Sequence, residues 1–284
     1  MRPTTETPTH DAPPNRVVAE FNAMADTFDT HHFLRLSAHR LVDWMTLAAG
    51  AQVLDVATGT GWAALAAAQR VGPTGTVVGI DLAPALLERA RQKAAAAGLT
   101  QVAFRTGDAT RLDVADQQCD VVLCTTALFF MPDMLAALRE WWRVLRPGGQ
   151  LGFSAWGSTY RQPLQGLWDA RLQQYGVARP AAAPDSAGNL RLADLATCRR
   201  LLHEAGFGPV DMQCEHVVYA FRTAEEWWAQ MSTSRSGLAL VQLAPAQRVQ
   251  FQVEHLAEVT ALATADGIVV DVAINIARGW KRAA

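Results

Sequence analysis

A glycine-rich turn between an apolar run and an alanine-rich run is the first feature whose residue types and spacing could support chemistry. Residues 52–68 read QVLDVATGTGWAALAAA. The apolar run is typical of a buried strand, and the alanine-rich run is typical of a helix. Gly59 and Gly61 can adopt positive φ angles and let a ligand approach the backbone closely, and the following helix offers free N–H groups to an anionic ligand. The pattern predicts a loop that binds a nucleotide-like cofactor.

An acid after the next apolar run strengthens this interpretation. Gly59, Gly61 and Ala64 satisfy a G-x-G-x-x-[GA] pattern, but such small residues can also serve only helix–strand packing. Residues 76–81 read TVVGID and end in Asp81, 20 positions beyond Gly61. A carboxylate there can accept hydrogen bonds from both hydroxyls of a ribose, which predicts a cofactor without a 2′-phosphate. The structural alternative is an acid that caps the helix expected to start near Pro84.

Five stretches together resemble one enzyme family. The runs DVATGTG at 55–61 and VVGIDLAPALLERAR at 77–91 resemble motif I and its successor in class I S-adenosylmethionine-dependent methyltransferases. The nearest group is that related to the C-methyltransferases of ubiquinone and menaquinone biosynthesis. GDATRLD at 107–113, CDVVLCTTALFFMPD at 119–133 and RVLRPGGQLGFSAW at 143–156 match further motifs in the expected order. The flanking segments match only loosely.

The resemblance implies S-adenosyl-L-methionine as cofactor and S-adenosyl-L-homocysteine as product. Asp55 would contact the methionine ammonium, directly or through water, although a buried structural acid bonded to loop amides is a competing interpretation. Asp108 would accept from the adenine amino group and Ala109 would donate its N–H to a ring nitrogen, unless Asp108 only stabilises a turn. The residues expected at the cofactor are Asp55, Ala57, Thr58, Gly59, Gly61, Asp81, Leu82, Asp108, Ala109 and Thr125.

The acceptor site is less clearly marked. Methyltransferases that act on nucleobase amino groups usually carry an Asn/Asp-Pro-Pro-aromatic run after the fourth strand, and residues 124–127 read CTTA instead, which argues against nucleic acid as acceptor. His31 and His32, at a break between two expected helices, and Tyr160 are the candidate catalytic bases. The alternative is that the two histidines are ordinary turn residues and that proximity alone suffices. The residues expected to contact the acceptor are Phe28, Thr126, Phe129, Trp156 and Tyr160.

Composition narrows the class of partner. The 284-residue chain has a net charge of −2, from 25 basic and 27 acidic residues spread without blocks, so neither a nucleic-acid groove nor an anionic membrane surface is indicated. We expect a small, rather apolar acceptor. The four cysteines form no C-x-x-C pair, so we expect neither a metal site nor disulfides. The sequence begins without a signal-peptide pattern and has no membrane-spanning stretch, so a cytoplasmic protein is expected, with a homodimer as one candidate assembly.

Alternating patterns predict an α/β fold with a doubly wound, mostly parallel seven-stranded sheet and a helical cap. Strands are expected at 52–57, 76–81, 101–106, 119–125, 149–155, 210–221 and 267–279, and helices at 62–71, 84–97, 133–146 and 195–207. The expected divisions are a disordered tail (1–15), an N-terminal helical lid (16–50), a cofactor-binding core (51–156) and a remainder (157–284) with cap segments at about 157–192 and 223–264.

The leading hypothesis is methyl transfer from S-adenosylmethionine to an O, C or N atom of a small, aromatic or apolar metabolite. An NAD-dependent oxidoreductase is the first alternative, because it shares the glycine loop and the ribose-binding acid. It explains neither GDATRLD nor LRPGG. The second alternative is a catalytically silent relative that binds the cofactor and acts through protein contacts. The acceptor itself cannot be named from the sequence.

Overall fold

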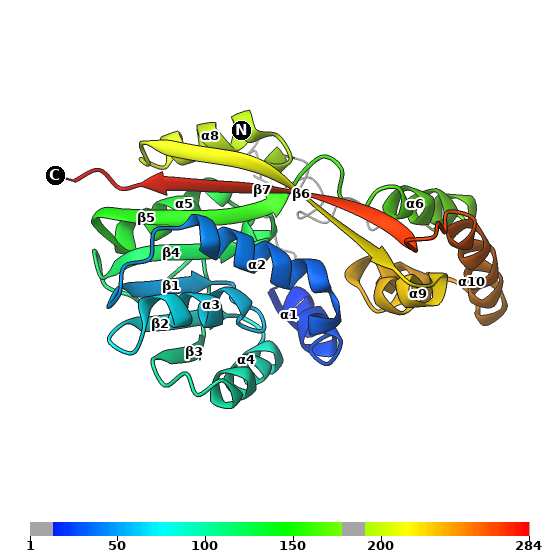
Figure 1. Ribbon diagram of the computed structural model, residues 1–284, viewed down its shortest axis with the longest axis horizontal. Helices are drawn as coiled ribbons and strands as arrows, with labels where there is room; N and C mark the ends of the chain where they lie inside the picture. Colours follow the sequence, from blue (N-terminus) through cyan, green and yellow to red (C-terminus); the bar gives the residue numbers. More distant parts are fainter. Residues whose placement is uncertain (1–13, 178–190, 284) are drawn as a thin grey trace, which may run out of the picture.

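One seven-stranded sheet runs through the molecule. The computed structural model describes residues 14–177 and 191–283, and its strands lie in the order β3-β2-β1-β4-β5-β7-β6 (Figure 1). The first five strands pair in parallel, and β7 is antiparallel to both of its neighbours. The predicted fold class is therefore confirmed. The strands are β1 (Gln52–Val56), β2 (Thr76–Asp81), β3 (Val102–Thr106), β4 (Cys119–Thr125), β5 (Leu145–Trp156), β6 (Val210–Phe221) and β7 (Ile268–Trp280).

Helices cover both faces of the sheet. Helices α2 and α3 pack together on one face, and α5 and α8 pack together on the other (Figure 1). The strands between them are buried on both sides, which is why the last four residues of β1 are all buried instead of alternating with exposed ones. The helices are α1 (Pro14–Ala23), α2 (His32–Trp44), α3 (Trp62–Val71), α4 (Pro84–Ala96), α5 (Met134–Val144), α6 (Leu164–Gln174), α8 (Leu195–Glu204), α9 (Ala224–Ser232) and α10 (Pro245–Thr260), with 3-10 turns η1 (Phe28–Thr30), η2 (Leu128–Phe130) and η3 (Arg235–Gln242).

The start of β5 differs from the sequence prediction. We expected a helix to 146 and a strand from 149, but α5 ends at Val144 and β5 begins at Leu145. Leu145 pairs with Cys119 of β4, and the register then shifts before Val121 pairs with Gln150. The local Pro-Gly-Gly signal is a helix stop, whereas the extra strand residues depend on pairing with a distant segment.

Strands β6 and β7 extend beyond the rest of the sheet as a two-stranded arm. β7 pairs with β5 only over 274–280, but with β6 over 268–279. Residues 268–273 therefore continue past Trp156, the carboxyl end of β5. Helices α9 and α10 connect the two strands at the far end of the arm, and α6 packs against α10 there (Figure 1). These helices form a cap beside the edge of the sheet where parallel α/β folds bind ligands.

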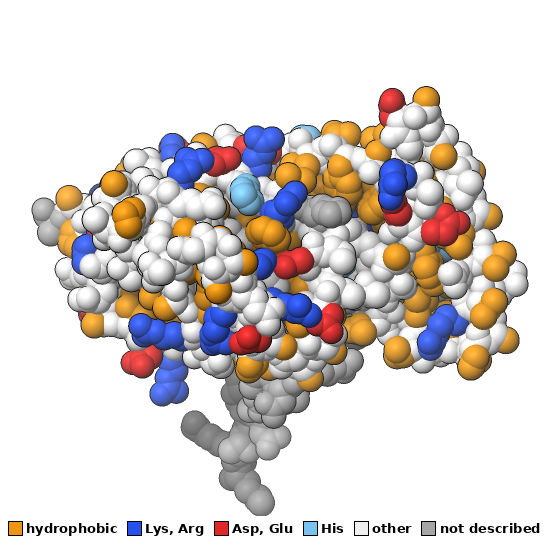
Figure 2. Space-filling view, turned by 60° about the horizontal axis from the view of Figure 1, so that its bottom comes forward, with side chains coloured by type: hydrophobic (Ala, Val, Ile, Leu, Met, Phe, Trp, Pro, Cys, Tyr) orange, Lys and Arg blue, Asp and Glu red, His pale blue; other side chains and the backbone are white. Residues whose placement is uncertain are grey.

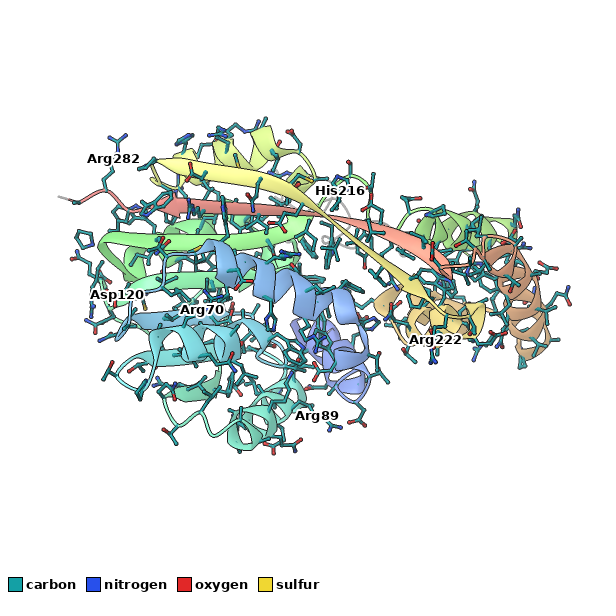
Figure 3. All side chains as sticks on the ribbon, in the orientation of Figure 1. Arg70, Arg89, Asp120, His216, Arg222 and Arg282 are labelled. Carbon is teal, nitrogen blue, oxygen red and sulfur yellow. The ribbon has the colours of Figure 1, made fainter. Side chains whose placement is uncertain are left out.

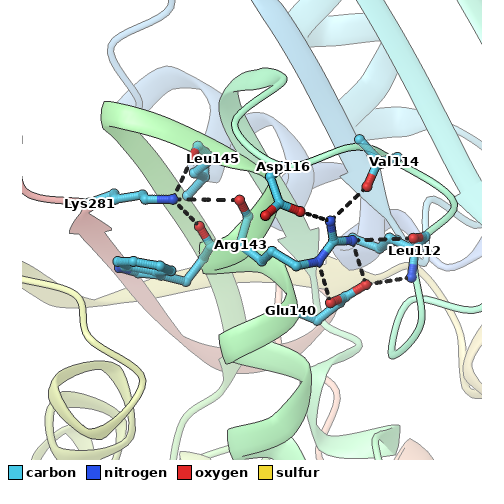
Figure 4. Close-up of polar contacts among 8 residues, drawn as sticks. Leu112, Val114, Asp116, Glu140, Arg143, Leu145 and Lys281 are labelled. Carbon is cyan, nitrogen blue, oxygen red and sulfur yellow. Dashed lines mark hydrogen bonds and ion pairs between the residues drawn. The ribbon is translucent and has the colours of Figure 1, made fainter.

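Two basic side chains, Lys281 and Arg143, stabilise the end of the sheet that lies opposite the arm. The Lys281 ammonium donates to the carbonyl oxygens of Trp142 (3.0 Å) and Leu145 (2.8 Å), where α5 ends and its carbonyls lack helical partners (Figure 4). Burial lowers the pKa of Lys281. Arg143 forms ion pairs with Asp116 and Glu140 (Figure 4). The end of β7 is thereby held against α5, at the opposite end of the sheet from the arm.

The N-terminal segments before α2 lie near the carboxyl ends of the parallel strands, the end of the sheet from which the arm extends. Helix α1 begins at Pro14, so only the last two residues of the predicted tail are described. Between α1 and α2 the chain makes the turn η1, at the break expected near residues 29–32. Basic and acidic side chains are interspersed over the face shown in Figure 2. Among the helices described, none is long and apolar enough to cross a bilayer.

Candidate functional site

The glycine-rich turn after β1 has the backbone that its sequence requires. Ala57, Gly59 and Gly61 have φ angles of 52°, 56° and 84°, in the left-handed region that favours glycine. A Cβ atom on Gly61 would lie 3.0 Å from Ala90 Cβ and from the ring of Phe104. Gly61 is therefore needed for close packing of the turn against α4 and β3, as well as for its own conformation. Helix α3 starts directly after it.

Asp81 ties the end of β2 to this turn. Its carboxylate accepts hydrogen bonds from the N–H groups of Gly59 (2.8 Å) and Ala83 (2.9 Å). Burial raises the pKa of Asp81, and the backbone hydrogen bonds oppose that shift. The Ala83 bond lies at the start of α4, so the helix-start interpretation of this acid and a ligand-binding interpretation are compatible. The acid stands beside the glycine turn.

Asp55 lies beneath the same turn and is almost fully buried. One carboxylate oxygen, Oδ2, accepts hydrogen bonds from Thr58 Oγ1 (2.5 Å) and from the N–H of Ala64 (3.0 Å). The other oxygen, Oδ1, is buried and has no hydrogen-bond partner among the described residues. Burial raises the pKa of Asp55 to about 7. The acid thus supports the turn and keeps one oxygen for another donor.

A small cavity of about 50 Å³ lies between the turn, the carboxyl end of β4 and the N-terminal segments. Thr125 lines it, and the Thr125 hydroxyl is buried without a hydrogen-bond partner in the described chain. Thr126 adopts a φ of 48°, and its N–H donates to Ser154 O (3.0 Å), which joins the ends of β4 and β5. The lining residues are Phe28, Leu34, Ala38, Ala57, Thr58, Gly59, Thr60, Trp62, Ala63, Thr125 and Thr126.

The turn η1 closes over the glycine turn. A Cβ atom on Gly59 would lie 3.4 Å from the ring of Phe28, so this ring rests on the turn itself. Asp29 accepts hydrogen bonds from Thr60 Oγ1 (2.5 Å), Trp62 Nε1 (2.8 Å) and Lys93 Nζ (2.9 Å). We call these four residues, Asp29, Thr60, Trp62 and Lys93, the lid clasp. Burial lowers the pKa of Lys93, and the Asp29 carboxylate opposes that shift.

Sequence reasoning did not identify the lid clasp. The available signal was an acid in the break between two expected helices, opposite a turn that carries a threonine and a tryptophan. Two further contacts hold the N-terminal segments to α4. Asn22 accepts from the N–H of Ala85 (3.0 Å), and Asp26 forms an exposed ion pair with Arg89, a residue labelled in Figure 3.

Two predicted acceptor residues, Trp156 and Tyr160, form an aromatic cluster with Phe33 at the end of β5 instead of lining the cavity. The ring of Trp156 lies 4.8 Å from that of Tyr160 and 5.1 Å from that of Phe33, between ring centroids. Phe28 and Thr126 do line the cavity. Phe129 is buried against Phe130, with centroids 4.7 Å apart, and is not among the lining residues.

The other predicted residues take different positions. His31 is buried, with its ring 5.7 Å from that of Phe33, whereas the His32 side chain lies outside the described part of the structure. Asp108 is exposed and accepts from the N–H (2.8 Å) and hydroxyl (2.7 Å) of Thr110, the contacts of a turn aspartate. Leu82 is also exposed, and Ala109 is buried. Across the described ranges, no three His, Cys, Asp or Glu side chains are grouped to hold a metal ion.

Comparisons with known proteins agree with this geometry. Residues 53–149 match the model of a methyltransferase domain. The chain is 33% identical over 168 residues to nocamycin O-methyltransferase of Saccharothrix syringae, covering 58% of this chain and 59% of that protein. It is 40% identical over 124 residues to demethylmenaquinone methyltransferase of Deinococcus radiodurans, covering 44% of this chain and 49% of that protein. The chain thus spans about half the length of these relatives.

A solved structure supports the fold over most of the chain. A putative methyltransferase from Bacillus halodurans superimposes with a TM-score of 0.59 over 87% of this chain and 99% of that one, at 22% identity. The matched segment, residues 53–149, contains the glycine turn and the two acids that flank it, Asp55 and Asp81. We conclude that the chain contains a class I S-adenosylmethionine-dependent methyltransferase domain.

Proposed function

We propose that this protein transfers the methyl group of S-adenosylmethionine to an O, C or N atom of a small metabolite. The observation that carries the proposal is a pair of buried oxygen atoms without a partner in the described chain, Asp55 Oδ1 and Thr125 Oγ1, beside a glycine turn that Asp81 also contacts. A buried polar atom without a partner costs free energy, so such atoms suit a ligand that supplies donors. The cofactor has an ammonium and two ribose hydroxyls for this purpose.

The roles of the residues follow from their positions. When bound, S-adenosylmethionine supplies an electrophilic methyl group on a positively charged sulfur. Asp81 would accept from the ribose hydroxyls, and Asp55 would accept from the ammonium. Thr58, Gly59 and the other predicted cofactor residues of the turn would contact the cofactor through their backbone. Phe28 and the lid clasp would exclude water, so that orientation and desolvation supply most of the rate.

The acceptor is proposed to be a small molecule that lies between the lid, the end of β5 and the cap. The aromatic rings of Phe33, Trp156 and Tyr160 favour a planar group there. His31, His32 and Tyr160 stay candidate bases, with proximity alone as the alternative. The homodimer and the cytoplasmic location also stay predictions. Two relatives are named for acting on nocamycin and demethylmenaquinone, which is consistent with a small organic acceptor.

The two alternatives have different expectations. An NAD-dependent oxidoreductase is not favoured, because residues 53–149 match a methyltransferase domain. A silent cofactor-binding relative would share every feature of the turn and would differ only in turnover.

Calorimetry of the full chain with S-adenosylhomocysteine and with NAD tests the proposal. We expect saturable binding of S-adenosylhomocysteine and at least about 100-fold weaker binding of NAD, since the proposal assigns Asp81 and the turn to one ribose and a methionine end. Stronger binding of NAD would overturn the proposal. Incubation with methyl-labelled S-adenosylmethionine and a panel of phenols, enols and amines then measures turnover. Tight binding with no labelled product from any acceptor would favour the silent relative.

A further inference from the structure

A buried arginine lies beyond the end of β5 and takes no part in the site described above. Arg161 directly follows Tyr160, and its side chain is only 2% exposed. Its backbone adopts a φ of 55°, in the left-handed region. A guanidinium is charged at every pH that proteins experience, so this is a permanent positive charge removed from water.

The neighbours of Arg161 do not neutralise that charge. Its Nη2 donates to Gln230 Oε1 (2.6 Å), and Nη1 lies 3.8 Å from Met231 Sδ. Within residues 14–177 and 191–283, the buried Nε has no hydrogen-bond acceptor, and no carboxylate lies within ion-pair distance of the guanidinium. Buried charges are normally paired, because desolvation without a counter-charge is costly.

Aromatic rings surround this guanidinium. Its Cζ lies 4.6 Å from the ring centroid of Trp227, 5.0 Å from that of Phe33 and 5.9 Å from that of Tyr160. Ring faces attract a cation but carry no net charge, so they compensate only in part. Burial raises the pKa of Tyr219 to about 12 against the opposing charge of Arg161, so the phenol is neutral near pH 7 and provides no anion.

The charge lies where the three parts of the molecule meet. Phe33 belongs to α2, Tyr160 follows β5, and Trp227 and Gln230 belong to α9 of the cap. Gln230 also donates from Nε2 to Thr30 O (2.8 Å), two residues after Phe28, the ring on the glycine turn. A ligand held beside Arg161 would therefore lie under the cap and next to the lid. Thr126 and Trp156 bring the ends of β4 and β5 to the same side.

We propose that Arg161 binds an anionic group of the methyl acceptor, and that the acceptor is a small planar compound bearing a carboxylate. This inference rests on the proposed function. A carboxylate can accept two parallel hydrogen bonds from a guanidinium and would use the free Nε donor. The rings of Phe33, Tyr160 and Trp227 would hold the planar part. The acceptor is then an aromatic acid with one charged end, more specific than the apolar metabolite expected from composition.

A purely structural role is the competing explanation. Arg161 could serve only to join the cap to the lid through Gln230. That role would stabilise the fold but would not distinguish an acid from a neutral compound of the same shape. The discriminating measurement is therefore a preference for charge, and stability alone does not decide between the two roles.

The experiment compares 2-naphthoate with 2-naphthamide by calorimetry, using the full chain saturated with S-adenosylhomocysteine. We expect wild-type protein to bind the acid at least about tenfold more tightly than the amide. Arg161→Gln should bind both equally, and Arg161→Lys should keep part of the preference, since it keeps the charge without the planar fork. Arg278→Gln is the matched control, because Arg278 also stacks on aromatic rings, those of Trp44 and Trp280, but is paired with Asp211.

The outcomes separate the two proposals. Equal affinity of wild-type protein for acid and amide, or no binding of the acid up to about 10 mM, would overturn the role of Arg161 without any variant having to fold. An unchanged preference in Arg161→Gln would overturn it as well. If S-adenosylhomocysteine itself does not bind, the proposed function fails first.

Discussion

Asp55 and Asp81 are carboxylates beside the same glycine turn, but their oxygens are occupied differently. Asp81 accepts two backbone N–H groups, one with each oxygen. Asp55 uses one oxygen for Thr58 and Ala64 and leaves the other without a partner in the described chain. One acid therefore positions the turn at its edge, and the other supports it from below. Substitutions at the two positions should have different consequences.

Asp81→Asn should weaken binding of S-adenosylhomocysteine about 10- to 100-fold, because an amide cannot accept from two hydroxyls as a carboxylate does. Calorimetry on the folded variant measures this directly. Asp43→Asn is the control, since Asp43 is an exposed acid that pairs with Arg70, labelled in Figure 3. Equal affinity of the Asp81 variant and wild-type protein would show that the ribose is bound elsewhere.

Asp55→Asn should change how stability depends on pH. The pKa of Asp55 is raised from 3.8 to about 7, so the native state holds a proton that the unfolded chain has lost. This contribution to stability is complete below about pH 4 and is lost as the pH rises to about 7. Relative to wild type, the free energy of unfolding of Asp55→Asn should rise by roughly 1–4 kcal/mol between pH 4.5 and 8. Urea unfolding at both pH values measures it, and a difference independent of pH would contradict the shift.

Residue types alone indicated some of these contacts but not others. Gly59, Gly61 and Asp81 are recognisable because their spacing along the chain reflects a local strand–turn–helix unit. Asp29 and Arg161 were not identified, since their partners come from segments far away in sequence. Nothing in the local pattern of Tyr160-Arg161 indicates that a cap helix will enclose the guanidinium.

Helix α1 and the turn η1 are held over the site by one small apolar cluster and by polar contacts. The cluster packs Phe21, Ala25 and Phe28 against the start of α4. The polar contacts are the lid clasp, the Asn22 hydrogen bond, and an ion pair between Glu20 and Arg235. Regions with few buried apolar contacts open most readily. The lid clasp should therefore control how long a ligand stays beneath Phe28.

Asp29→Ala should speed dissociation of S-adenosylhomocysteine at least about tenfold, because three donors of the lid clasp lose their acceptor together. Asp26→Ala is the control: it removes only an exposed ion pair with Arg89 and should change the rate less than about twofold. Stopped-flow displacement measures both. If the two variants dissociate at the same rate, the clasp does not hold the lid.

At the level of elements, the sequence predicted the helices and strands of the core better than how they are arranged beyond it. Alanine-rich and β-branched runs located helices α3 and α4 and strands β1 and β2, because each run reflects its own local propensity and burial. The lengths of β6 and β7 were predicted to within one residue, but their projection beyond β5 as an arm was not. It depends on β5 ending at Trp156 while its neighbour continues, and only the pairing of the strands reveals this.

At the scale of the whole molecule, the cap contains a buried titratable group of its own. His255 is fully buried, accepts a hydrogen bond from Trp227 Nε1 (2.9 Å), and has its pKa lowered from 6.5 to about 4 by burial. The unfolded chain binds a proton that the native cap does not. This contribution is complete above about pH 6.5 and is lost as the pH falls to about 4, the opposite direction to Asp55. A fall in pH therefore stabilises the core through Asp55 and destabilises the cap through His255.

His255→Gln should remove the part of the pH dependence of stability that comes from this histidine. Glutamine is neutral and can still accept from Trp227, so the free energy of unfolding relative to wild type should rise by roughly 1–3 kcal/mol as the pH falls from 7 to 4.5. Thermal or urea unfolding at the two pH values checks this. His203→Gln, at an exposed histidine of α8, is the control for replacing a histidine by glutamine. A loss of stability in His255→Gln that is the same at both pH values would mean that the histidine matters only for packing.

The strand order also governs how the chain can fold during its own synthesis. β7 leaves the ribosome after β5 and β6, yet it lies between them in the finished sheet. Until residues 268–281 emerge, β5 has an open edge and β6 has no neighbour. Lys281 then meets the end of α5, made more than a hundred residues earlier. The edge of β5 therefore stays unpaired until β7 is made, and an exposed strand edge is where a chaperone, or a neighbouring nascent chain, could bind.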